Sequence, residues 1–197
     1  MAPPSGLRER KKERTRAEIE RVAMRLFLER GFDAVTVDEI GAAAEVSHRT
    51  FYRYFASKED LVLRDIREFL DEMRVAFTKR PTSESVIESL RAVILQLAET
   101  YEHDADDDRQ RVGLLLASPS LQHRRQEQHV AFESALVPLI ADRLSADPAH
   151  DMRPALIAAC AGAALRVATE SWISDDMATP LAPKVDEAFS LLIAGLT

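Results

Sequence analysis

The first quarter of the sequence predicts two short helices that only three residues, 45–47, separate. The first covers about residues 37–44, because Thr36 opens a Thr-Val-Asp-Glu capping box that satisfies free backbone N–H groups. The second covers about residues 48–54, with Ser47 as its N-cap. A connection this short leaves no room for another element, so the two helices must cross as a compact helix-turn-helix.

The second helix combines an apolar anchor with hydrogen-bond donors. Four of the 12 aromatic residues of the chain lie within residues 51–55. Phe51 and Phe55 are four residues apart and share one face, so we expect them to anchor the helix to a core. Side chains with hydroxyl or guanidinium donors are Thr50, Tyr52, Arg53 and Tyr54. Such donors suit the phosphates and base edges of DNA, and the alternative is a buried helical hairpin with an aromatic core.

Charge is distributed unevenly along the chain. Residues 1–55 carry a net charge of +2, whereas residues 56–197 carry −9. Within residues 8–16, six basic side chains outweigh two glutamates. A cationic end on an acidic body indicates a head that binds polyanions, and the alternative is a solvated terminus.

Apolar residues recur at helical spacing along the whole chain, and no stretch alternates convincingly with the period of a strand. The expected helices cover about residues 19–30, 37–44, 48–54, 57–79, 86–97, 109–117, 121–144, 154–173 and 185–196. The sequence therefore predicts an all-α fold of about nine helices in two domains. The N-terminal three-helix domain, residues 1–55, carries a basic N-terminal arm, and residues 56–197 form a helical bundle. The first half of the segment 154–173 is apolar all round, so we expect it to be buried on most sides.

The segment from Ile19 to Leu61 resembles the DNA-binding domain of the TetR family of transcriptional regulators. The matching positions are Ile19, Ala23, Leu26, Phe27, Gly31, Thr36, Val37, Ile40, Ala42, Ala44, Val46, Ser47, Thr50, Tyr52, Tyr54, Phe55, Lys58 and Glu59. The resemblance implies phosphate contacts from Thr36 and Lys58, and sequence choice tuned by His48 and Arg49. The predicted DNA-binding residues are Thr36, Ser47, His48, Arg49, Thr50, Tyr52, Arg53, Tyr54 and Lys58.

Two residues depart from the family's pattern. Glu45 stands in the turn where the family usually has glycine, so a positive φ there is strained or the turn differs. Arg49 stands where many members have glycine, which adds a side chain that can read a base or bind a phosphate.

The body, residues 82–197, resembles the family's ligand-binding and dimerisation domain. Residues 109–144 resemble the branch of the mycofactocin-regulator type, which implies a long-chain acyl-CoA or similar effector. Candidate pocket residues are Phe69, Met73, Leu114, Phe132, Leu136 and Trp172, and the alternative is that they are plain core. Arg124 and Arg125 can meet a phosphate-bearing effector or form a solvated face. The small residues 158–164 suit a dimer interface or a core within one subunit.

The sequence contains no candidate catalytic site. The five histidines form no i, i+4 pair, no glycine cluster forms a phosphate loop, and Cys160 lies in an apolar run where a thiol stays inert. We therefore expect no catalytic residue, metal or cofactor.

The predicted protein is a cytoplasmic regulator that binds a double-stranded DNA operator as a homodimer and responds to a small amphiphilic effector, without membrane association. A DNA-binding regulator without an effector and a helical enzyme are the alternatives.

Overall fold

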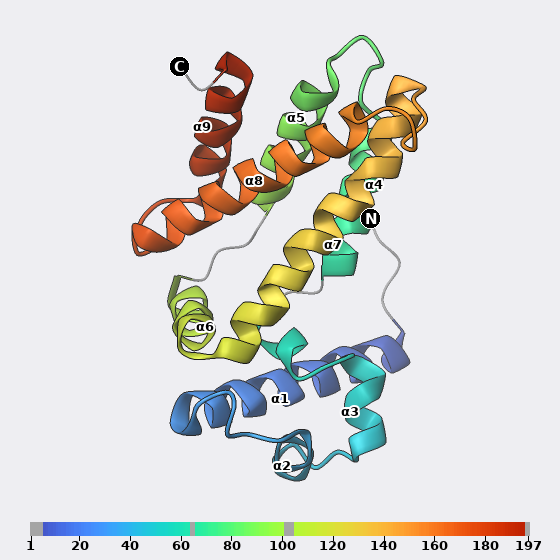
Figure 1. Ribbon diagram of the computed structural model, residues 1–197. Coiled ribbons are helices and arrows are strands. Elements are labelled where there is room, and N and C mark those ends of the chain that lie inside the picture. Colours follow the sequence, from blue (N-terminus) through green and yellow to red (C-terminus); the bar gives the residue numbers. More distant parts are fainter. Residues whose placement is uncertain (1–5, 64–65, 101–104, 196–197) are drawn as a thin grey trace. The chain divides into compact units, whose positions relative to one another are not determined.

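The computed structural model describes residues 6–63, 66–100 and 105–195, and these contain helices and no strand (Figure 1). The helices are α1 (Leu7–Arg30), α2 (Val37–Ala43), α3 (His48–Tyr54), the 3₁₀ helix η1 (Glu59–Leu61), α4 (Ile66–Thr78), α5 (Val86–Thr100), α6 (Ala105–Ala117), α7 (Pro119–Leu144), α8 (Arg153–Ser174) and α9 (Leu181–Ala194). The all-α prediction is confirmed.

The chain divides into two compact units, each with its own hydrophobic core. The first takes the described residues up to 63 together with residues 110–124, so parts of α6 and α7 belong to it. The second takes the remaining described residues. The contacts of the first unit therefore extend beyond residue 55, and the functional division into residues 1–55 and 56–197 stays a prediction.

The helix ends of the first unit follow the sequence signals. Gly31 ends α1 at φ +83°, and its N–H donates to the carbonyl of Phe27 (2.8 Å). Thr36 and Glu39 form both bonds of the predicted capping box. Hydrogen bonds from the backbone N–H of Thr36 and from Arg30 lower the pKa of Glu39 to about 2. The carboxylate thus stays ionised and fixes the start of α2.

The turn between α2 and α3 rests on a close backbone contact. Glu45 adopts φ +55°, the left-handed conformation that favours glycine, which confirms that its departure from the family's pattern is strained. Beyond it, the N–H of Val46 donates to the carbonyl of Gly41 (2.8 Å). A Cβ atom on Gly41 would lie 2.9 Å from the carbonyl oxygen of Val46. The turn therefore requires a residue without a side chain at position 41.

Two expectations about helix starts are wrong. The first helix begins at Leu7 and not near residue 19, so the basic segment 8–16 is helical, and its Lys, Arg and Glu residues are strong helix formers. The expected break over residues 104–108 is contradicted from Ala105 onward, where α6 begins with three aspartates in its first turn. Acidic side chains are favoured there by the helix dipole, and residue 104 lies outside the described residues.

The single helix expected over residues 57–79 is also wrong. The carboxylate of Asp60 accepts hydrogen bonds from the backbone N–H groups of Ala56 and Ser57, both 3.1 Å, as a capping carboxylate does, but only the short helix η1 follows. The hydroxyl of Ser57, at the start of the expected helix, is buried and has no hydrogen-bond partner among the described residues. Val62 and Leu63 follow η1 as a turn and a bend, and α4 begins at Ile66.

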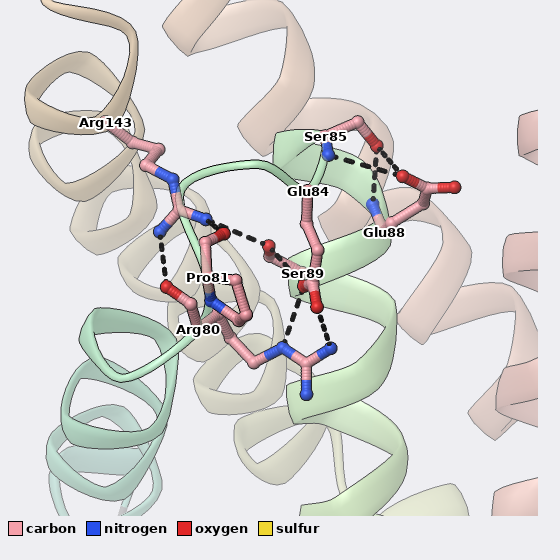
Figure 2. Close-up of polar contacts among 7 residues, drawn as sticks. All are labelled: Arg80, Pro81, Glu84, Ser85, Glu88, Ser89 and Arg143. Carbon is pink, nitrogen blue, oxygen red and sulfur yellow. Dashed lines mark hydrogen bonds and ion pairs between the residues drawn. The ribbon is translucent and has the colours of Figure 1, made fainter.

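In the second unit, α8 packs on α9 and α5. An arginine of α7 forms hydrogen bonds with the loop between α4 and α5. Arg143 donates to the carbonyl oxygens of Arg80 (3.2 Å) and Pro81 (Figure 2). It also donates to Ser89 (3.3 Å), a fully buried hydroxyl that donates to Glu84 (3.0 Å). Glu84 in turn accepts two bonds from Arg80, at 2.9 and 2.6 Å. In this hydrogen-bond network each of four side chains has at least one partner: Arg80, Glu84, Ser89 and Arg143 (Figure 2).

The prediction that the first half of α8 is buried on most sides is wrong for a single chain. Pro154, Ala158 and Ala161 are buried, whereas Leu156 is 58% exposed. Later in the helix, Val167 is 51% exposed. By length and composition alone α8 could cross a membrane, but one such helix is also what the core of a water-soluble protein provides. Here α8 packs on α5 and α9, and another part of its surface exposes the apolar side chains of Leu156 and Val167.

We predict that Gly41→Ala destabilises the first unit by about 1–3 kcal/mol, because the added methyl group overlaps the carbonyl of Val46. The control is Gly113→Ala in α6, where an added Cβ meets nothing within 4 Å. That change should stabilise the chain by about 0.5–1 kcal/mol. Urea unfolding followed by circular dichroism measures both. Equal stability of the two variants would contradict this account of the turn.

Candidate nucleic-acid interface

Helix α3 is fixed at its start by a cap and along one face by aromatic packing. The Ser47 hydroxyl accepts a hydrogen bond from the N–H of Thr50 (3.1 Å), as the sequence predicts. Phe51 is fully buried, and its ring centroid lies 5.5 Å from that of Phe55. Arg16 of α1 covers the Phe55 ring at 5.4 Å. Burial on this side leaves the other side of α3 exposed.

The exposed side of α3 carries the predicted donors. His48, Arg49, Tyr52 and Arg53 are exposed, and Thr50 and Tyr54 are half-buried. The rings of His48 and Tyr52, one turn apart, are 4.7 Å from each other. Arg49 has no hydrogen bond or ion pair with the residues that the structure describes, so its five N–H donors face solvent.

The C-terminal end of α3 meets the basic start of α1. Arg53 donates to the Tyr54 hydroxyl (3.2 Å) and lies 5.0 Å from the centre of its ring. This bond is the main cause that lowers the pKa of Tyr54, with further contributions from Thr15 and Lys12. Thr15 was not among the predicted site residues. Thr15 lies within the basic segment 8–16, but its place beside Tyr54 depends on a helix that begins at Leu7, which was not predicted from the sequence.

The two residues implied as phosphate contacts are already engaged within the first unit. Thr36 is exposed, and its hydroxyl both accepts from the N–H of Glu39 and donates to its carboxylate. The ammonium group of Lys58 donates to the carbonyls of Phe32 and Val35, both at 2.8 Å. It also lies 4.1 Å from the centre of the Phe32 ring. Lys58 therefore fixes the turn that precedes α2, and a third N–H remains for another partner.

The structure separates the six candidate pocket residues. Phe69, Met73, Phe132 and Leu136 gather in the core of the second unit, where the Phe69 and Phe132 rings are 5.9 Å apart. Leu114 packs instead in the core of the first unit. Trp172 is buried outside that group, and its indole N–H donates to the carbonyl of Thr179 (2.7 Å).

A capped helix whose exposed face carries unengaged donors, set behind a three-residue turn, defines a helix-turn-helix DNA-binding protein. Two family models match the chain. "Bacterial regulatory proteins, tetR family" matches residues 19–64, and "MftR C-terminal domain" matches residues 84–197. The chain therefore belongs to the TetR family of bacterial transcriptional regulators.

Relatives match over most of their length. The HTH-type transcriptional regulator TcmR of Streptomyces glaucescens is 33% identical over 173 residues, which are 85% of this chain and 76% of TcmR. The regulator MftR of Mycobacterium tuberculosis is 29% identical, over 95% of this chain and 93% of MftR. Both are named as regulators of transcription.

Solved structures share the fold. The repressor FadR of Thermus thermophilus, solved in complex with lauroyl-CoA, has a TM-score of 0.53 and 27% identity, over 92% of this chain and 95% of FadR. SmeT, the repressor of a Stenotrophomonas maltophilia multidrug efflux pump, has a TM-score of 0.59 and 20% identity, over 91% of this chain and 88% of SmeT.

We predict that Lys58→Met lowers the stability of the first unit by about 1–3 kcal/mol, because two part-buried carbonyls lose a charged donor. Lys11→Met makes the same change at an exposed position of α1 and should leave stability unchanged within about 0.5 kcal/mol. Thermal unfolding of both variants measures the difference. An unchanged melting temperature in Lys58→Met would show that these bonds contribute nothing to the turn.

Proposed function

We propose that this regulator is a repressor that binds a palindromic operator as a homodimer and is released by a small amphiphilic effector. The observation that carries the proposal is the free, exposed guanidinium of Arg49 on the face of α3 opposite its buried anchor. In this proposal residues 1–55 bind DNA, and residues 56–197 bind the effector and dimerise.

The contacts divide into two kinds. Arg49 and His48 at the start of α3 read bases in the major groove, and Thr50, Tyr52 and Tyr54 complete the DNA face. Phosphates are contacted or positioned by Thr36, Ser47, Arg53 and Lys58, together with the basic start of α1. The lowered pKa of Tyr54 fits a phenol placed among cationic donors.

Exposed apolar residues on α8 support the dimer. Leu156 and Val167 are three helical turns apart on α8 and therefore share a face. On α9, Leu191 is 50% exposed and Ile193 is 43% exposed. Leu191 and Ile193 lie on different sides of α9, so Leu156 and Val167 on α8 mark the interaction surface, which a two-fold dimer covers with a second copy.

The effector proposal rests on the core of the second unit and on one neighbour. Apolar contacts for an alkyl chain would come from Phe69, Met73, Phe132 and Leu136, which lie in one apolar cluster. The FadR structure, at 27% identity, was solved with lauroyl-CoA, a ligand of the predicted chemical type. We infer that a long-chain acyl-CoA or a similar amphiphile is the effector class.

We predict that the full chain selects a near-palindromic sequence from a random double-stranded DNA library. Arg49→Ala should weaken binding to that sequence by about 1–3 kcal/mol and to scrambled DNA much less, because it removes a base contact. The control is Arg21→Ala, which removes an exposed arginine paired with Glu18 on α1 and should change neither affinity. Equal losses on both DNAs would reassign Arg49 to the backbone, and no selected sequence would contradict the proposed function.

We predict that Val167→Glu converts the dimer into a monomer, because two-fold symmetry places a carboxylate from each copy in an apolar interface. Val75→Glu makes the same change on α4, at a position 44% exposed, and should leave the dimer intact. Sedimentation velocity at micromolar concentration distinguishes the two. A monomeric wild-type chain, with or without DNA, would contradict the dimer.

A further inference from the structure

A partly buried cluster of polar side chains lies in the second unit between α7 and α8, with Glu170 at its exposed edge. Arg125 and His129 come from α7, and Arg166 and Glu170 come from α8. The Nη2 atom of Arg125 and the Nδ1 atom of His129 are both buried and have no hydrogen-bond partner among the described residues. Buried polar atoms in folded proteins are nearly always paired, so two adjacent exceptions need an explanation.

The cluster has an excess of positive charge. Arg166 pairs with Glu170 (3.3 Å), which leaves Arg125 without a matching carboxylate in the group. Burial lowers the pKa of His129, and the nearby charges of Arg125 and Arg166 lower it further, against the opposite effect of Glu170. Burial also lowers the pKa of Arg125. The imidazole is therefore neutral at pH 7, and the group carries two guanidinium ions against one carboxylate.

The same face of α7 continues into the apolar core. Residues 125, 129, 132 and 136 follow each other at intervals of four, three and four, which places them along one side of the helix. Phe132 and Leu136 are buried in the core of the second unit, and the Phe132 ring contacts that of Phe69. One helix face therefore passes from the unpaired polar atoms of Arg125 and His129 to aromatic and aliphatic side chains within three turns.

We propose that Arg125, His129 and Arg166 bind the anionic head group, carboxylate or phosphate, of an amphiphile whose chain lies toward Phe69 and Phe132. The inference rests on the proposed function, in which the body binds an effector, and it defines the chemistry that the effector must have. An anion supplies the acceptors that Arg125 and His129 lack and neutralises the excess charge. A neutral amphiphile of the same length makes only the apolar contacts.

The test is calorimetric titration of the full chain with three probes that share a 12-carbon chain: sodium dodecanoate, lauroyl-CoA and 1-dodecanol. We expect at least one of the anionic probes to bind at least tenfold more tightly than dodecanol. Stronger binding of dodecanoate assigns a carboxylate head group, and stronger binding of lauroyl-CoA assigns a phosphate. If neither anion binds more tightly than dodecanol, the proposal is overturned. Operator binding is measured separately, so this result would leave the proposed DNA-binding function untouched.

Arg125→Met tests the site itself, because methionine keeps an apolar stem of similar length and removes the charge. We expect at least a tenfold loss of affinity for the anionic probe and no change for dodecanol. The melting temperature of this variant should not fall, since the substitution removes a buried unpaired donor. Arg74→Met, on exposed α4, is the matched control and should bind every probe as the wild type does. Unchanged anion binding in Arg125→Met, or an equal loss for dodecanol, would overturn the proposal.

The pH dependence separates a binding role of His129 from a structural one. An anion beside the imidazole raises its pKa, so affinity for the anionic probe should increase as the pH falls from 8 to 6. The charged groups around the imidazole are Arg125 on its own helix and Arg166 and Glu170 on α8. In His129→Gln the same titration should be flat between these pH values. A variant with the wild-type slope would remove His129 from the site.

Discussion

The exposed face of α3 depends on the backbone contact between Gly41 and Val46. The N–H of Val46 donates to the carbonyl of Gly41, and the carbonyl of Val46 occupies the space that a Cβ on residue 41 would need. This close approach requires a strained left-handed conformation at Glu45. Once the turn is set, Ser47 caps α3, Phe51 enters the core, and the donors on the other side of the helix face solvent.

The second unit folds around its own core, and the chain joins the two units through helices that contribute to both. Residues 119–124 of α7 belong to the first unit and residues 125–144 to the second. Arg124 lies 3.7 Å from Asp60, whose carboxylate organises the segment after α3. Arg125, the next residue, begins the cationic end of the proposed effector site. A change in the position or rotation of α7 on effector binding therefore has a direct covalent route to the DNA-binding unit.

Local signals predicted the parts of the structure that local interactions decide. The caps at Thr36 and Ser47 and the strain at Glu45 each depend on residues within a few positions, and all three are confirmed. The long helix expected from residue 57 is wrong because only η1 forms there and α4 begins at Ile66, a break that apolar periodicity does not reveal. Leu114 could not be assigned to the correct core, since its partners are distant in sequence. The face that joins Arg125 to Phe132 was readable from spacing, but its unpaired atoms required the fold.

The central claim is that an anionic amphiphile in the second unit weakens DNA binding by the first. The most direct measurement is operator affinity of the wild-type chain with and without a saturating concentration of the tightest-binding anionic probe, paired with probe affinity in the presence and absence of operator. We predict a 5- to 150-fold loss of operator affinity, which corresponds to about 1–3 kcal/mol of coupling free energy. The operator should weaken the binding of the probe by the same factor. Operator affinity that is unchanged while the probe is shown to be bound would contradict it.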